Sequence, residues 1–414
     1  MTLSNLLDNA EQILGPEQTK EHYNEIAKTL LNNYNKTPGL LMELQLISIS
    51  EDAIYAWLTS GNKKIEDLAL DLLQCYAHNH KVTISYPFIN KCIDSNPFQN
   101  GFNVKELQNK STEEKDVLIR ENLNYRKYDR LISILMQFCV ERKTPVSILI
   151  RAQKIGGTVT SLYTMKACKN QFNAIRPIKF GLHNKKQIIR EEALLACHGN
   201  QRTLGIVAFA LEEHGSSYLG SMNNIADYLL SFSEIPLDKA IRFLKIGNKK
   251  IYETIQQLYQ HPLDYDDLIG LCSTDNIYIR MFAIHNIMSL QSEENKKDVT
   301  EKVISSLDNF KIRHKDEEFL QYAELFHTIY GHNNQYGIVP IEDVKEWQKS
   351  KNDVRRLAAI ISCEYRAETP EKILQKGFKD KNRYVQTHAY LVCRSINLSN
   401  ESINKLSRRH RKPF

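Results

Sequence analysis

The stretch that decides the fold is Asn276-Ile277-Tyr278-Ile279-Arg280-Met281-Phe282-Ala283, a polar residue followed by a mostly apolar run. Asn276 is suited to cap a helix, because its side-chain oxygen accepts hydrogen bonds from the free backbone N–H groups of a first turn. Ile279 opens a buried stripe, and Ala283, one turn later, lies on the same face. A small residue there lets a neighbouring helix approach closely. The segment therefore predicts a helix that begins at a turn and packs against another helix.

The same order recurs in degenerate form along the chain. Each copy has a polar residue (often Asn), a short gap, Ile or Val, often Arg, and a small residue four positions after the Ile or Val. The copies begin at Asn62, Ile189, Asn248, Asn276, Val354 and Asn382. Ile255 stands where Ala is expected in one copy, and Gln386 takes the place of Arg in another. One copy means little, whereas several at loop-to-helix junctions favour an array of paired helices.

Helical periodicity also covers most of the remaining chain. Gly and Pro are scarce, at 16 and 11 of 414 residues, which argues against a sheet-rich protein with many tight turns. The sequence predicts four segments. These are an N-terminal helical region (1–104), a helical region with weak repeats (105–180), a repeat array (181–400) and a basic tail (401–414). The predicted fold class is all-α, with an irregular N-terminal third.

Three segments resemble the second half of HEAT repeats, an armadillo-like family of α-solenoids. They are 275–287, 351–361 and 380–393. Asp275, Ile279 and Arg280 match the order of Asp, Val and Arg at that family's inter-helix turn, and Val354 and Arg355 match its Val and Arg. The resemblance implies helix pairs of about 40 residues stacked into a right-handed superhelix.

The resemblance also implies a structural role for the arginines of the repeated turns. They are Arg190, Arg280 and Arg355. In the HEAT family this Arg commonly bridges turns within the chain. We therefore expect Arg280 to pair with the turn at Asp275 or with a neighbouring turn.

Stacked repeats present a long surface that suits a protein, a peptide or a nucleic acid. The leading hypothesis is a non-enzymatic protein–protein interaction scaffold, whose partner contacts exposed side chains on the second helices of the pairs. The alternative is a nucleic-acid-binding protein. Residues 347–360 are similar to part of the DNA glycosylases built on HEAT-like repeats, which hold alkylated DNA in a basic groove with Trp and a catalytic Asp. A continuous positive groove with Trp347 exposed in it would favour that alternative.

Charge is concentrated at the C-terminus. The net charge is +6, and the last ten residues contain five basic and no acidic side chains, so the rest of the chain is nearly neutral. The basic residues are Lys405, Arg408, Arg409, Arg411 and Lys412. They are the candidate contacts for phosphate, an acidic protein surface or a nucleic acid.

No motif assigns a catalytic, cofactor-binding or metal-binding residue. Cys75, His78 and His80 offer zinc ligands, but a structural site needs four, so a buried thiol followed by loop histidines is the simpler interpretation. The segment 154–158 lacks the spacing of a phosphate-binding loop and predicts an inter-helix turn with Thr158 as a cap. Residues 212–214, Glu-Glu-His before Gly215, are interpreted as a solvated helix end.

Cysteine usage and hydropathy give the expected location. The eight Cys residues are scattered singly through apolar runs, which predicts reduced, buried thiols rather than a disulfide framework. The N-terminus lacks the basic region of a signal peptide. The most apolar segment, 131–140, is too short to cross a bilayer. We therefore expect a cytoplasmic protein without cofactors, with a protein partner or, alternatively, a nucleic acid.

Overall fold

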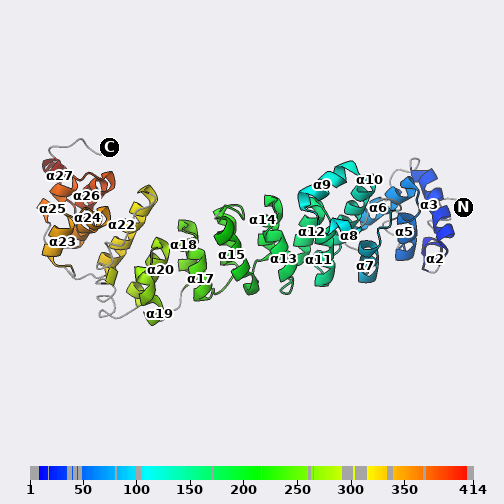
Figure 1. Ribbon diagram of the computed structural model, residues 1–414, viewed down its shortest axis with the longest axis horizontal. Coiled ribbons are helices and arrows are strands. Elements are labelled where there is room, and N and C mark those ends of the chain that lie inside the picture. Colours follow the sequence, from blue (N-terminus) through cyan, green and yellow to red (C-terminus); the bar gives the residue numbers. More distant parts are fainter. Residues whose placement is uncertain are drawn as a thin grey trace. The chain divides into compact units, whose positions relative to one another are not determined.

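The computed structural model describes residues 9–16, 18–34, 40, 44, 49–79, 82–98, 104–169, 171–215, 217–259, 263, 265–290, 302–303, 315–332, 339–366 and 370–407. All regular secondary structure in these residues is helical (Figure 1), so the predicted all-α class is confirmed for them. The chain divides into two compact units, unit 1 (Met1–Ser233) and unit 2 (Glu234–Phe414). The division falls inside the segment 181–400, which the sequence presents as one array.

Unit 1 is built of two layers of helices. Its helices are α2 (Ala10–Ile13), α3 (Lys20–Tyr34), α5 (Glu51–Leu58), α6 (Lys63–Asn79), α7 (Tyr86–Asp94), α8 (Val104–Leu107), α9 (Thr112–Glu121), α10 (Leu123–Gln137), α11 (Val146–Ile155), α12 (Thr158–Cys168), α13 (Ile175–Leu182), α14 (Gln187–Ala196), η1 (Gln201–Thr203), α15 (Leu204–His214) and α16 (Met222–Leu230). Helices α7, α11, α13 and α15 pack in series in the first layer, and α6, α10, α12, α14 and α16 in the second. Each helix thereby covers the apolar face of its neighbours.

Unit 2 repeats this arrangement. Its helices are α17 (Leu237–Leu244), α18 (Lys249–Leu258), α19 (Tyr265–Ile269), η2 (Gly270–Ser273), α20 (Ile277–Leu290), α22 (Lys315–His332), α23 (Ile341–Trp347), α24 (Asp353–Ser362), η4 (Cys363–Tyr365), α25 (Glu371–Gly377), α26 (Arg383–Ser395) and α27 (Asn400–Ser407). Helices α18, α20, α22, α24 and α26 pack in series, and α17, α19, α23 and α25 pair with members of that layer. No helix in the described parts of either unit is both long and apolar enough to cross a bilayer.

The repeated sequence pattern corresponds to one helix junction. The Asn side chain caps the second helix of a pair: Asn276 Oδ1 accepts from Tyr278 N at 3.0 Å, and Asn382 Oδ1 accepts from Tyr384 N at 2.9 Å. The same cap is present at Asn62, Asn248 and Asn352. The Ile or Val that follows is buried in each copy, including Ile65, Ile251, Ile279 and Val385. Apart from the copy at Val354, the pattern therefore marks equivalent positions in both units.

A second position also corresponds between helix pairs. It lies near the end of the first helix, five residues before the residue that caps the second helix. Trp57 and Trp347 occupy it before Asn62 and Asn352, and their side chains are 0% and 5% exposed. Gly181 and Gly377 occupy it in two other pairs, where they face Ala193 and Ala389 of the second helices, respectively. Both tryptophans therefore belong to the core between paired helices.

The described residues before residue 180 also contain paired helices. Helices α5 and α6 form a pair, and so do α11 and α12, while α8 and α9 are inserted between α7 and α10. The polar stretch at 112–121 is a helix that begins with a capping box of Ser111 and Glu114. The sequence pattern does not reveal that α12 is the second helix of a pair, because its N-cap residue is Gly157 and not Asn.

The cap of α12 is supplied by carboxylates that are distant in sequence. Asp129 accepts from Gly157 N at 2.6 Å and from Thr160 Oγ1 at 2.9 Å. Asp116 accepts from Thr158 N at 3.0 Å and from Thr158 Oγ1 at 2.6 Å, and it pairs with Lys186. Two carboxylates at this helix start leave no place for a phosphate, and Gly156 and Gly157 form the inter-helix turn between α11 and α12.

Asp116 gives a prediction about acid stability. Partial burial raises the pKa of its carboxyl, but the hydrogen bonds from Lys186 and Thr158 prevail and hold that pKa below its usual value. Its contribution to stability is therefore full above the unfolded pKa of about 4 and is lost as the pH falls through the folded pKa. We expect Asp116→Asn to reduce the unfolding free energy by about 1 kcal/mol at neutral pH. Urea unfolding at several pH values measures this, and a difference that persists unchanged at acid pH would contradict the assignment.

Candidate interaction site

A groove crosses three successive inter-helix turns of unit 1, after α10, α12 and α14. It encloses about 750 Å³ and is lined by Lys143, Thr144, Pro145, Gln171, Phe172, Asn173, Gly199, Asn200, Gln201 and Arg202. This volume is typical of ligand-binding clefts. We call this feature the turn groove. Its lining comes from loops, which a stack of helix pairs brings side by side at regular intervals.

Hydrogen bonds between the turns fix the floor of the turn groove. Gln171 Nε2 donates to the main-chain oxygen of Arg142 at 3.2 Å, and Asn200 Nδ2 donates to that of Phe172 at 3.4 Å. In both cases an amide on one turn reaches the backbone of the preceding turn. The loops are thus tied into a ladder, so the groove is largely formed before any ligand binds.

The chemistry of the turn groove is cationic and partly apolar. Lys143 and Arg202 are exposed in its lining, and none of the described residues that line it is acidic. Phe172 is 63% exposed, so its ring offers apolar surface to a ligand. The amides of Gln171 and Asn173 add hydrogen-bonding groups. This combination suits an extended ligand that carries negative charge and at least one apolar side chain.

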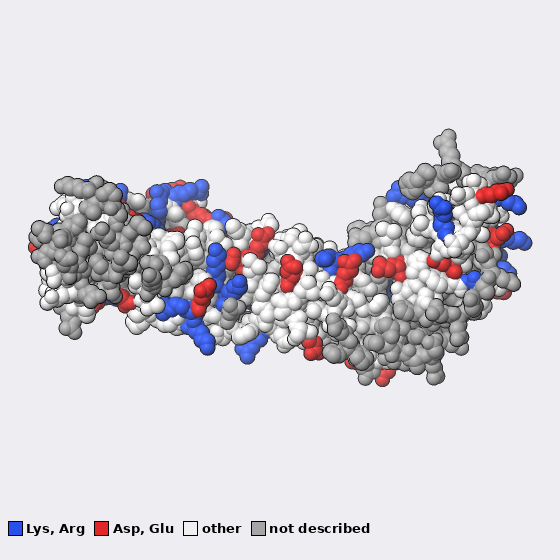
Figure 2. All heavy atoms as spheres, turned by 180° about the vertical axis from the view of Figure 1, so that it is seen from behind, with Lys and Arg blue, Asp and Glu red and all other residues white. Residues whose placement is uncertain are grey.

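The second-layer helices, where sequence reasoning places the partner contacts, also expose apolar side chains in unit 1. They are Val159 on α12, Ile188 and Leu195 on α14, and Leu230 on α16, each between 45% and 54% exposed. The charged side chains on the face drawn in Figure 2 are of both signs and interspersed, without a continuous basic band over the described residues.

The arginines predicted at the repeat turns take two different positions. Arg190 donates to the main-chain oxygens of Tyr218, at 2.7 Å, and Asn184, at 2.8 Å. Arg280 is 1% exposed and donates to the oxygen of Thr274, beside the exposed Asp275. These two side chains stabilise turns within the chain.

At α24 the bridging arginine is Arg356 rather than Arg355. Arg356 is 5% exposed and donates to Asp380 Oδ2 at 2.7 Å and to the oxygen of Ser350 at 2.8 Å. Arg355 is half-buried. Arg190, Arg280 and Arg356 hold equivalent positions, because each donates to the main-chain oxygen six residues earlier. Arg356 follows the Asn352 cap by four residues, just as Arg280 follows the Asn276 cap. At this turn the counterpart of Arg190 and Arg280 is therefore Arg356, one residue after the Arg355 that the family pattern indicates.

None of the other candidate residues is among those that line the turn groove. Lys405 is exposed on α27, and the tail residues Arg408, Arg409, Arg411 and Lys412 lie outside the described residues. Cys75 and His78 belong to no three-residue ligand cluster in the described part of the chain, and His80 lies outside it. All eight Cys are free thiols, and all except the half-buried Cys75 are buried. Burial raises the pKa of Cys197 to about 12, which keeps that thiol protonated.

Comparisons with known proteins do not assign a family. No protein family and no curated protein matches the chain. Among solved structures, the chain is similar to an engineered protein whose crystal structure comes from the Northeast Structural Genomics Consortium. The two are 14% identical over 95% of this chain and 99% of that chain, with a TM-score of 0.32. A likeness this weak carries no argument about fold or function.

Proposed function

We propose that the chain is a non-enzymatic scaffold of HEAT-like helix pairs that binds an extended acidic segment of a partner protein in the turn groove. The observation that carries this proposal is the lining of the groove, whose described residues include two exposed cations and an exposed Phe172 but no carboxylate. An Asp or Glu of the ligand would lie near Lys143 or Arg202, and an apolar side chain would pack on Phe172.

Three features of the fold support a scaffold. Paired helices pack in series within each unit, as they do in the HEAT family. The turn groove crosses several repeats, so its length suits a chain segment better than a compact metabolite. The buried, reduced thiols fit the proposed cytoplasmic location. A right-handed superhelix remains part of this proposal.

The nucleic-acid alternative has less support from the side chains it requires. Trp347 is buried between α23 and α24, so it offers no stacking surface to a base. Within the segment that resembles DNA glycosylases, Arg356 is engaged with Asp380 of a later turn, and the two side chains are 6% and 4% exposed. The binding test below therefore includes a nucleic acid as a competing ligand.

Selection from a library of random displayed peptides tests the proposed function. We expect the full chain to select peptides rich in Asp and Glu around an aromatic or aliphatic residue. Lys143→Glu combined with Arg202→Glu should weaken their binding at least about tenfold, and Phe172→Ala should weaken it similarly. Fluorescence anisotropy with labelled peptides provides the measurement, and circular dichroism checks that each variant is folded.

Matched controls separate the groove from general surface charge. Lys166 is exposed on α12 and Phe180 is 46% exposed on α13, and neither lines the groove. Lys166→Glu and Phe180→Ala should leave binding unchanged. Selection of peptides without acidic residues, equal effects of control and groove variants, or tighter binding of a single-stranded oligonucleotide would each overturn the proposal.

A further inference from the structure

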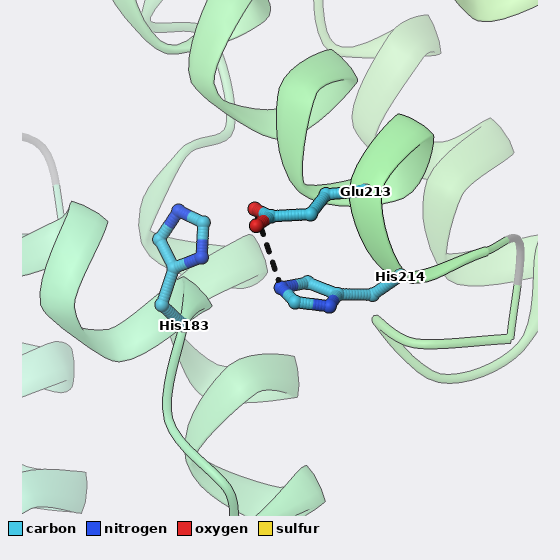
Figure 3. Close-up of side chains that lie close together, drawn as sticks. All are labelled: His183, Glu213 and His214. Atoms are coloured by element: carbon cyan, nitrogen blue, oxygen red, sulfur yellow. Dashed lines mark ion pairs between the residues drawn. The ribbon is translucent and has the colours of Figure 1, made fainter.

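Three metal-binding side chains meet at one edge of unit 1, away from the residues that line the turn groove. His183 follows the last residue of α13, and Glu213 and His214 are the last two residues of α15. One ligand atom from each lies within 4.8 Å of the other two, and Glu213 Oε2 is 3.5 Å from His214 Nε2. Figure 3 shows His183 facing this pair from the neighbouring helix.

Packing against other rings positions both imidazoles. The His214 ring lies on Tyr218, with 4.1 Å between ring centroids, because Gly215 turns the chain back with a φ of 90°. Tyr218 is held by the Arg190 guanidinium, 4.3 Å from its ring centroid. The His183 ring lies 6.1 Å from that of Phe209 on α15. The two imidazoles are thus oriented by contacts that do not involve Glu213.

His183 Nε2 is buried, and no described residue forms a hydrogen bond with it. Figure 3 shows the other ring nitrogen of His183 on the side that faces Glu213 and His214.

We propose that His183, Glu213 and His214 form a site for one divalent transition-metal ion of the zinc class. Two imidazoles and a carboxylate are a ligand set that Zn²⁺ accepts, with a fourth tetrahedral position left for water or another ligand. Metal–ligand distances near 2.0 Å place tetrahedral ligands about 3.3 Å apart. The Glu213–His214 pair is already close to that separation. Glu213 is 49% exposed and His214 33% exposed at the side chain, so both have room to adjust towards His183.

Such a site would act as a clamp between successive repeats. His183 belongs to the end of α13 and the other two ligands to the end of α15, and these helices are neighbours in the first layer. An ion bound to all three would tie the two helices together. The sequence does not predict this site, because residues 212–214 by themselves indicate only a solvated helix end. The third ligand, His183, is brought to them by the fold.

Zinc titration of the full chain, freed of metal with a chelator, tests this proposal. Isothermal titration calorimetry should show one Zn²⁺ per chain, and thermal unfolding should shift upwards with Zn²⁺. His214→Ala and Glu213→Gln, both at exposed positions, should each weaken Zn²⁺ binding at least about tenfold, as should His183→Ala. Co²⁺ bound in place of Zn²⁺ should give visible ligand-field bands without the near-ultraviolet charge-transfer band of a Co–thiolate bond.

His198→Ala is the matched control. His198 is half-buried in the same unit, and its Nε2 likewise has no described hydrogen-bond partner, but it lies outside the cluster. Zn²⁺ affinity should be unchanged in this variant. Unaltered Zn²⁺ affinity in the doubly substituted Glu213→Gln, His214→Ala chain would overturn the proposal, as would a Co–thiolate spectrum or the absence of any stoichiometric binding.

Discussion

Replacement of Arg356 by alanine is expected to lower the unfolding free energy of unit 2 by about 3–5 kcal/mol. Arg356 donates from Nε and Nη2 to the two oxygens of Asp380, at 2.7 and 3.1 Å, and also bonds to Asp353. The Asp380 side chain is 4% exposed. Without the guanidinium, a buried carboxylate loses its counter-charge, and two main-chain oxygens of the preceding turn lose a donor.

Arg355→Ala provides the internal control for this experiment. It removes the same charge one residue away but leaves the Asp380 pair intact, so its effect should be smaller than that of Arg356→Ala. Arg356→Lys should lie between the two, because an ammonium retains the charge but lacks the planar fork that matches a carboxylate. Differential scanning calorimetry of the full chain resolves these differences. Equal losses from Arg355→Ala and Arg356→Ala would show that the register assigned from the Asn352 cap is incorrect.

Gly181→Val should destabilise unit 1 by about 3 kcal/mol. A Cβ added at Gly181 would lie 2.8 Å from Ala193 Cβ on α14 and would also overlap Met165 Sδ on α12. Met165 is flexible and able to move, but Ala193 Cβ is fixed to the helix backbone, so the paired helices must separate. Urea unfolding followed by circular dichroism measures the loss.

A complementary exchange tests whether this contact is the cause. Gly181→Ala introduces the overlap in its smallest form, and Ala193→Gly removes the opposing Cβ, so the double variant should recover part of the stability lost by Gly181→Ala. Gly270→Ala is the control, because an added Cβ there meets nothing within 4 Å. A double variant whose loss equals the sum of the two single losses would refute the proposed contact.

The local features of the fold could be predicted from the sequence. The Asn caps, the buried Ile and Val positions and the small residues one turn later are properties of single helices and their turns, which neighbouring residues determine. Ile65, Ile279 and Val385, which the pattern expects to open the buried stripes of three different helices, are all buried. Two arginines, Arg355 and Arg356, stand side by side in the sequence, and only the fold shows that Arg356 is the one that meets Asp380.

What the sequence determined by itself is therefore the helical class and the junction at which each repeated second helix begins. Only the tertiary structure decided which distant groups meet. The carboxylates that cap α12 come from residues 28 and 42 positions away along the chain. The turn groove takes its lining from three separate loops, and the His183 cluster takes its ligands from two helices. The physical reason is that caps and periodic stripes depend on contacts within a few residues, whereas grooves and ligand sets depend on how whole helices stack.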